Sequence, residues 1–144
     1  AIVIKKMAQD LNMGVEIKIL PIIREKDGIA MSSRNVYLSD EERQDATSLS
    51  QALDRAEFVI KQGERDPDKI IKWIEDIIQK KHTARIDYVS IVDAKDLKPM
   101  EKIVGETLIA AAVFFGKTRL IDNVMIKVDS KDREQPAKKG AFKD

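Results

Sequence analysis

The stretch Thr107–Val128, TLIAAAVFFGKTRLIDNVMIKV, decides the fold of the second half of the chain. Two runs rich in β-branched and aromatic residues, 107–115 and 118–128, flank the pair Gly116-Lys117. A two-residue connection that contains glycine is typical of a β-hairpin. A third strand-like run, IDYVSIV, covers residues 86–92. The sequence therefore predicts an antiparallel sheet of about three strands.

Two helices are predicted upstream of this sheet. Ser39-Asp-Glu-Glu42 is a capping-box pattern, in which the Ser39 side chain accepts from the backbone of Glu42 and the Glu42 side chain reaches back. Asp66-Pro67 combines a capping residue with a proline at the first helical position. Each start is followed by apolar residues at helical spacing: Ala46, Leu49, Leu53, Ala56 and Ile60, then Ile70, Ile71, Trp73, Ile74, Ile77 and Ile78. Residues 39–128 are thus expected to form a small α+β domain of two helices packed on the sheet.

The first 38 residues have a different pattern. Residues 2–12 place apolar side chains at helical spacing, and Val15–Ile23 reads as a strand with Pro21 near its end. A helix followed by a buried strand is the repeating unit of α/β folds. We expect 1–38 to be the end of an α/β domain, with 24–38 as a loop, and 129–144 to be a disordered tail because it is polar and almost without apolar residues.

The composition excludes several classes of protein. Lys+Arg 26 against Asp+Glu 25 gives a net charge of +1, which argues against a dedicated nucleic-acid binder. The chain has no cysteine and a single histidine, so cysteine-ligated and multi-histidine metal sites are excluded, and we propose no metal-ligating residue. No apolar run is long enough to span a membrane, and the N-terminus lacks the features of a signal peptide. We expect a cytoplasmic protein.

The loop Asp27–Asn35, DGIAMSSRN, is the leading candidate for a binding site. Gly28 lets the chain bend, and the hydroxyls of Ser32 and Ser33 with the guanidinium of Arg34 can donate charge-assisted hydrogen bonds to phosphate. Arg24 and Lys26 add positive charge on the same loop. The alternative is structural: the serines form local turns, and Arg34 pairs with a nearby acid such as Asp27 or Glu25.

Other candidate sites have simpler explanations. Phe115-Gly-Lys-Thr118 resembles the end of a phosphate-binding P-loop, but that loop needs a glycine at position 111, which is alanine. His82 follows two lysines at a helix end, where a cation suits the helix dipole. Trp73 fits a core position. Asp87, Asp93 and Asp96 could form a carboxylate site, although strand-end capping explains them as well.

The motif Arg24-x-x-Asp-Gly-Ile-Ala-Met-Ser-Ser-Arg-Asn-x-Tyr-Leu-Ser39, followed by Glu42-Arg43, closely resembles the signature of the pantoate–β-alanine ligase (pantothenate synthetase) family. The segments 87–93 and 108–123 resemble the C-terminal domain of the same family. The resemblance covers nearly all of residues 1–128. It implies the end of a Rossmann-like nucleotidyltransferase domain at 1–38, with an MSSR loop similar to the KMSKS loop of class I aminoacyl-tRNA synthetases, and a lid domain at 39–128.

The resemblance also implies the reaction. Pantoate attacks the α-phosphate of ATP to give pantoyl adenylate and pyrophosphate, and the amine of β-alanine then displaces AMP to form pantothenate. Ser32, Ser33 and Arg34 would hold the triphosphate as the catalytic set, Met31 and the backbone at Ile23 would line the nucleotide site, and Mg²⁺ would neutralise phosphate charge. The full-length enzyme of such a family is expected to be a homodimer that binds neither nucleic acid nor membrane.

The chain also departs from the family pattern. The histidine-rich HxGH-type motif, the lysine of a Gly-Glu-Lys-Asp segment and the pantoate-binding glutamines of the family's N-terminal half do not occur in it. We therefore expect that these 144 residues do not catalyse ligation alone. The alternative is a non-catalytic binding or interaction module derived from a synthetase-like nucleotidyltransferase.

Overall fold

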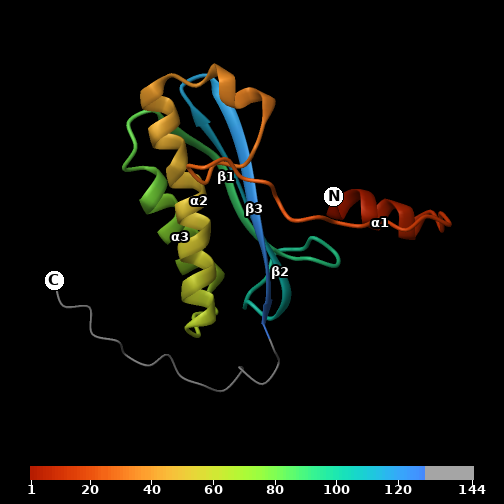
Figure 1. Cartoon of the computed structure of the whole chain (residues 1–144). Coiled ribbons are helices and arrows are strands. Elements are labelled where there is room, and N and C mark those ends of the chain that lie inside the picture. Colours follow the sequence, from red (N-terminus) through yellow and green to blue (C-terminus); the bar gives the residue numbers. More distant parts are fainter. Residues whose placement is uncertain (129–144) are drawn as a thin grey trace.

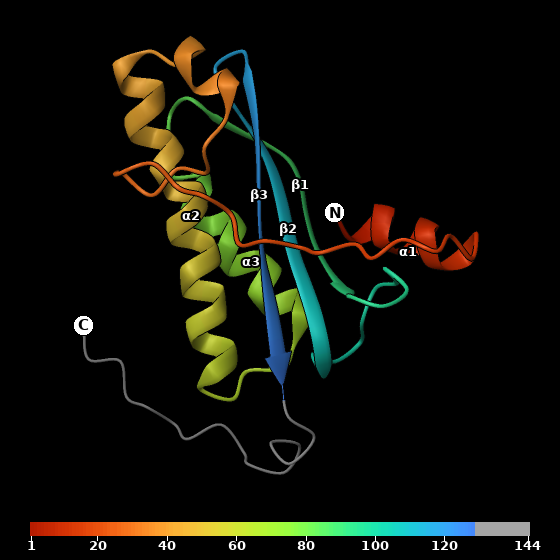
Figure 2. The ribbon, with the colours of Figure 1, turned by 45° about the vertical axis from the view of Figure 1, so that its right-hand side comes forward.

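A computed structural model of the chain describes residues 1–128, which form three α-helices, one short 3-10 helix and one three-stranded sheet. The elements are α1 (Ile2–Asp10), η1 (Ser33–Tyr37), α2 (Asp40–Lys61), α3 (Pro67–Ile78), β1 (Ala84–Asp93), β2 (Gly105–Phe115) and β3 (Thr118–Val128). Helices α2 and α3 lie together on one side of the sheet (Figures 1 and 2). The predicted α+β unit of two helices on three strands is confirmed. The expected tail at 129–144 lies outside the described residues.

The sheet is an antiparallel meander in the order β1-β2-β3. Phe115 pairs with Thr118 across the two-residue turn, which confirms the hairpin expected at Gly116-Lys117. Gly116 has a φ of +56°, a conformation that glycine adopts without steric cost. On the other edge, the register of β1 against β2 shifts between Ile86 and Tyr88, so Asp87 is an extra residue in β1.

Both helices begin where the sequence predicts. Ser39 accepts from the backbone N–H of Glu42 at 3.2 Å, and the Glu42 carboxylate accepts from the backbone N–H of Ser39 at 2.8 Å, so the capping box is complete. The Asp66 side chain accepts from the first turn of α3, with Pro67 as its first residue. Most residues of their apolar stripes meet alternate residues of the strands in one core, which includes Leu49, Leu53, Ile60, Ile70, Ile74, Ile78, Ile109, Val113 and Phe115. Trp73, expected in this core, is instead 39% exposed.

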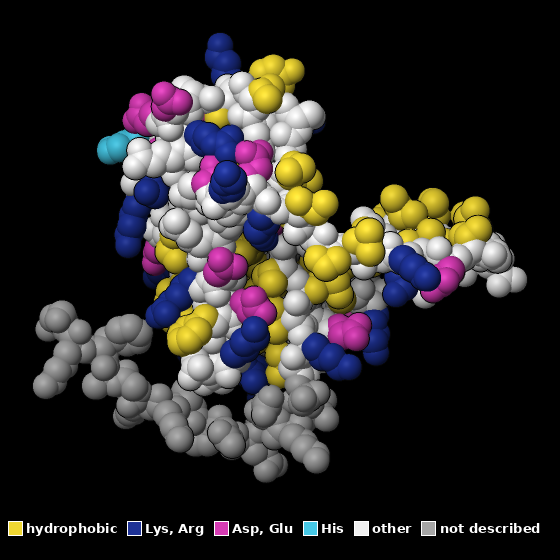
Figure 3. Space-filling view, in the orientation of Figure 1, with side chains coloured by type: hydrophobic (Ala, Val, Ile, Leu, Met, Phe, Trp, Pro, Cys, Tyr) yellow, Lys and Arg dark blue, Asp and Glu magenta, His cyan; other side chains and the backbone are white. Residues whose placement is uncertain are grey.

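The N-terminal segment differs from expectation. Helix α1 forms, but Val15–Ile23, predicted to be a strand, runs as an extended chain that pairs with no strand among residues 1–128. A strand needs a neighbour to satisfy its backbone N–H and C=O groups, and the described part of the chain offers this segment none. Helix α1 stands away from the helix-sheet unit (Figures 1 and 3). Large apolar side chains stay exposed along α1 and the segment after it: Val3, Ile4, Met7, Leu11, Met13, Val15, Ile19, Leu20, Ile22 and Ile23.

Replacing Gly116 by alanine should destabilise the fold for two reasons. An L-residue in the left-handed conformation costs about 1–2 kcal/mol. A Cβ at this position would also overlap the Glu42 carboxylate and so disturb the capping box, whose loss costs up to about 1 kcal/mol more. The measurement is the free energy of unfolding from urea titration. The control is Gly105→Ala, where φ is +67° and no atom lies within 4 Å of the added Cβ. Equal losses in the two variants would contradict a role for the Glu42 contact.

Candidate functional site

Residues 24–30 form a tight turn that leads into the candidate binding loop. Arg24 and Ala30 form an isolated antiparallel bridge, and the N–H of Glu25 donates to the carbonyl of Ile29 at 2.8 Å. Gly28 closes the turn with a φ of +89°, and its N–H donates to the carbonyl of Glu25 at 2.9 Å. Ile29 is buried in the main core. The turn is therefore fastened to the helix-sheet unit.

A partly buried ion pair joins this turn to β3. Arg24 donates to the two carboxylate oxygens of Asp122 at 2.6 and 3.2 Å, and its Nη1 also donates to the carbonyl of Gly28 at 3.1 Å. The side chain of Asp122 is only 2% exposed. The hydrogen bond and charge of Asp122 raise the pKa of Arg24, although partial burial of the guanidinium acts in the opposite direction. A fork-to-fork pair of this kind fixes orientation as well as distance.

A second set of contacts joins the turn to α2. Arg43 donates to Glu25 at 2.5 Å and lies 2.7 Å from Asp27. The side-chain amide of Asn35, which is buried, donates to Glu25 at 2.5 Å and to the carbonyl of Ala30 at 3.1 Å. These hydrogen bonds, that from Asn35 first and that from Arg43 second, lower the pKa of Glu25. The bonds to Glu25 and then to Asp27 raise the pKa of Arg43.

The predicted site residues follow directly after this turn. Ser32 caps η1, and its hydroxyl accepts from the backbone N–H of Arg34 at 3.2 Å. Ser33 and Arg34 are exposed, and the side chain of Met31 is 63% exposed. The structural alternative for Arg34 is not supported, because Glu25 and Asp27 pair with Arg43 instead. Among the described residues, the one hydrogen bond found for the Arg34 guanidinium is a 3.4 Å contact to the carbonyl of Arg119.

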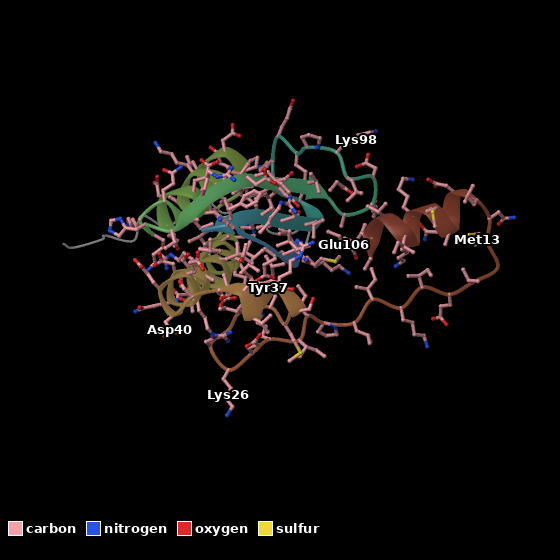
Figure 4. The ribbon with its side chains drawn as sticks, turned by 90° about the horizontal axis from the view of Figure 1, so that it is seen from above. Met13, Lys26, Tyr37, Asp40, Lys98 and Glu106 are labelled. Atoms are coloured by element: carbon pink, nitrogen blue, oxygen red, sulfur yellow. The ribbon has the colours of Figure 1, made fainter. Side chains whose placement is uncertain are left out.

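Two further candidates lie at the edges of the loop. The side chain of Ile23 is 70% exposed, and its carbonyl accepts from the N–H of Met31 at 2.9 Å, so the two residues expected to line a nucleotide site are adjacent. Lys26 points away from the rest of the molecule at the tip of the turn (Figure 4), so it does not converge with Arg34.

A small pocket lies between this loop, α2 and β3. Its volume is about 60 Å³, and Met31, Ser32, Ser50, Arg119 and Asp122 are among its lining residues. Sites for drug-sized ligands usually measure about 300–1,000 Å³. The pocket among the described residues is therefore too small to enclose a nucleotide, and Ser33 and Arg34, which directly follow its lining residue Ser32, are exposed.

The remaining candidates take structural roles. Asp87 accepts two hydrogen bonds from Arg119, at 2.7 and 3.0 Å. Asp93 and Asp96 accept from backbone N–H groups two residues further on, as in ordinary turns. His82 is exposed. Within residues 1–128, no group of three or more His, Asp or Glu side chains could hold a metal ion. None of the helices in this part of the chain is both long and apolar enough to cross a membrane.

Three residues that organise the site were not identified from the sequence: Arg43, Arg119 and Asp122. Arg43 was visible only as part of the motif. Asp122 carried the clearest signal, because it is a charged residue at an inward position of an alternating strand, between Leu120 and Val124. Such a residue needs a buried partner of opposite charge.

Comparison with known proteins shows the family to which the chain belongs. The family model described as "Pantoate-beta-alanine ligase" matches residues 1–125. The chain belongs to this family. It is 58% identical over 126 residues to the pantothenate synthetase of Acetivibrio thermocellus, and 50% identical over 127 residues to that of Carboxydothermus hydrogenoformans. Each match covers 88% of this chain and 45% of the relative, so the chain spans less than half the length of these pantothenate synthetases.

Solved pantothenate synthetases have the same fold. The crystal structure of the Thermus thermophilus enzyme matches 85% of this chain and 44% of its own length, with a TM-score of 0.78 and 36% sequence identity. A pantoate-beta-alanine ligase of Francisella tularensis, crystallised in complex with "Beta-gamma ATP and Beta-alanine", matches 85% of this chain and 38% of its own. Its TM-score is 0.52 at 23% identity, so this second likeness concerns the fold alone.

The contacts of Glu25 predict a sensitivity to acid. The pKa of Glu25 in the folded chain lies below its ordinary value of 4.5, so the folded state binds fewer protons than the unfolded state between the two values. The stability from these contacts is therefore present above the ordinary pKa and is lost as the pH falls through the lowered one. When the pH is lowered from about 7 to about 3, the urea midpoint of Glu25→Gln should fall less than that of the natural chain.

The control for this experiment is Glu57→Gln. Glu57 forms a surface pair with Lys61 one turn further along α2, and such pairs contribute little to stability. This variant should show the same loss with acid as the natural chain. An equally steep loss in Glu25→Gln would assign the acid sensitivity to other carboxylates.

Proposed function

We propose that this chain is the C-terminal part of an ATP-dependent ligase that condenses pantoate with β-alanine. The observation that carries the proposal is the loop Met31–Arg34, in which two serine hydroxyls and a guanidinium without an acidic partner among the described residues lie on a turn fixed by ion pairs. Uncompensated donors of this kind suit a triphosphate. The family match and the relatives named pantothenate synthetase supply the reaction.

The proposed reaction has two steps. A carboxylate oxygen of pantoate attacks the α-phosphorus of ATP, the bond to the bridging oxygen of the β-phosphate breaks, and pyrophosphate leaves. The amine of β-alanine then attacks the acyl carbon of pantoyl adenylate, loses a proton and displaces AMP. In the first step negative charge increases on the departing pyrophosphate. Donors fixed in advance around that charge stabilise the transition state more than the ground state.

The residues of the loop take separate roles in this proposal. Arg34 and the hydroxyls of Ser32 and Ser33 bind the β- and γ-phosphates. Met31 and the backbone of Ile23 lie against the nucleoside. The resemblance also implies Mg²⁺, but residues 1–128 hold no cluster of acidic side chains for it, so we assign it no ligand and no step. The exposed apolar residues of α1 and of Val15–Ile23 suit packing against the rest of a Rossmann-like domain.

The whole ligase is the unit that would act. The matched relatives are more than twice as long as the matched stretch, so we propose that the wall facing Arg34, with the pantoate site, comes from the part of a ligase that precedes it. We further propose a cytoplasmic homodimer for that whole enzyme. On this proposal the 144 residues alone show no pantoate-dependent exchange between pyrophosphate and ATP.

A chimera tests the function directly. The part of the Acetivibrio thermocellus synthetase that precedes the matched stretch is fused to residues 1–128 of this chain, since 58% identity over that stretch makes the domains compatible. The fusion should catalyse exchange of labelled pyrophosphate into ATP in the presence of pantoate, and the chain alone should not. Exchange by the chain alone, or a folded fusion without exchange, would contradict the proposal.

In this fusion, Arg34→Ala should slow the exchange by about 10²–10³-fold, which is typical of removing one donor to the developing charge in a transition state. The free energy of unfolding should stay within about 0.5 kcal/mol, because an exposed side chain contributes little to stability. Lys26→Ala is the matched control, since it removes an exposed positive charge from the same turn on the side that faces away. Equal rates for the two variants would remove Arg34 from the phosphate site.

A further inference from the structure

We infer that Arg24 and Asp122 are a positioning pair for the proposed triphosphate loop, Met31–Arg34: their partly buried ion pair fixes this loop to β3, although neither side chain touches the phosphates. The inference rests on the proposed function of the loop. It adds to that function a residue from the hairpin, far along the chain from Arg34, whose role no part of the motif suggests. It also implies that the loop moves with the helix-sheet unit rather than with α1 and the extended segment.

The first step is the connection between Arg24 and the loop. Arg24 begins the turn, and the turn ends at Ala30, directly before Met31. The guanidinium bonds both to Asp122 and to the carbonyl of Gly28, so it holds the two sides of the turn together. Any shift of Arg24 is therefore passed to Met31 through this short turn.

The second step is the rigidity of Asp122. This residue lies in the middle of β3, opposite Ala111 of the central strand, and its side chain is 2% exposed. One oxygen also accepts from the backbone N–H of Asn123 at 2.8 Å. A buried carboxylate with these bonds has little freedom to move, and an arginine placed against it takes one orientation.

The third step is the contrast with the other contacts of the turn. Arg43 holds Glu25 and Asp27 from α2, but these two carboxylates are 27% and 30% exposed, so water can replace the bonds, whereas Asp122 is 2% exposed. Loss of the Asp122 charge instead leaves the partly buried guanidinium of Arg24 without its ion-pair partner, which is unfavourable. Detachment of the turn from β3 would relieve this cost by exposing Arg24 to water. The Arg24–Asp122 pair is thus the contact whose loss should free the loop while the core remains folded.

Hydrogen exchange of the chain tests this inference without relying on enzyme activity. Asp122→Asn should speed exchange of the N–H groups of Glu25 and Met31 at least about tenfold, while the N–H of Val113 in the central strand keeps its protection. The N–H of Glu25 donates to the carbonyl of Ile29 within the turn at 2.8 Å, and that of Met31 donates to the carbonyl of Ile23, just before the turn, at 2.9 Å. Should Asp122→Asn fail to fold, Arg24→Lys gives the comparison in milder form, because lysine keeps the charge but cannot form the two parallel bonds.

Asp45→Asn is the matched control. The Asp45 carboxylate is also largely buried and accepts from the N–H and the hydroxyl of Thr83 at 3.2 and 2.9 Å, so it ties α2 to the segment before β1. It has no contact with residues 24–34 among the hydrogen bonds and ion pairs found within residues 1–128. This variant should lower the melting temperature without selective exchange at Glu25 and Met31. Unchanged loop protection in Asp122→Asn, or the same selective loss in Asp45→Asn, would overturn the inference.

The chimera then distinguishes positioning from mere stability. Asp122→Asn should lower the maximal rate of pyrophosphate exchange at least about tenfold, as expected when a reacting group is misplaced, and leave the KM for pantoate unchanged. Arg24→Lys, which keeps the positive charge, should lose less of the maximal rate than Asp122→Asn. A freed loop with a normal exchange rate would overturn the positioning role. A fusion that is inactive before any substitution would contradict the proposed function. In that case hydrogen exchange would still decide whether the Arg24–Asp122 pair fixes the loop to β3.

Discussion

The burial of one face of the β2–β3 hairpin under α2 and α3 is the constraint on which the rest of the structure depends. Because side chains alternate across a strand, this burial sends Leu120, Asp122 and Val124 toward the helices and leaves Arg119 and Ile121 on the other face. A slip of one residue would exchange the two sets. The hairpin register therefore determines that a carboxylate, and not a hydrocarbon, faces the turn before Met31–Arg34.

Charge in this protein is arranged locally, which a net charge of +1 conceals. The acidic side chains of the turn form ion pairs with Arg43, and the carboxylate of the hairpin forms an ion pair with Arg24. Arg34 is left without an acid among the ion pairs of the described residues. This separation explains how a nearly neutral chain can present one exposed guanidinium without an acidic partner in its described part: the paired charges of the turn neutralise each other within hydrogen-bonding distance.

Local signals made the helix-sheet unit predictable from the sequence. The capping box at Ser39, the Asp66-Pro67 start and the glycine at the hairpin turn each determine their structure within a few residues. The strand expected at Val15–Ile23 was wrong for this structure because strand formation depends on a partner, and no local pattern supplies one. The Arg24–Asp122 pair was missed for a related reason: its members are 98 residues apart, and only the register of the hairpin brings them together.

The same contacts determine which segments of the chain are held to the helix-sheet unit and which are not. The turn and Met31–Arg34 are tied to α2 and β3 by ion pairs and by buried Ile29, whereas the segment before Ile23 has no comparable contact with the helix-sheet unit within the described residues. If the proposed ligase closes over its substrates, bending near Ile23 costs the fewest contacts. The donors on Ser32, Ser33 and Arg34 would then move as one body with the sheet and reach the phosphates together. Donors that are already in place before charge develops in the transition state contribute most to the rate.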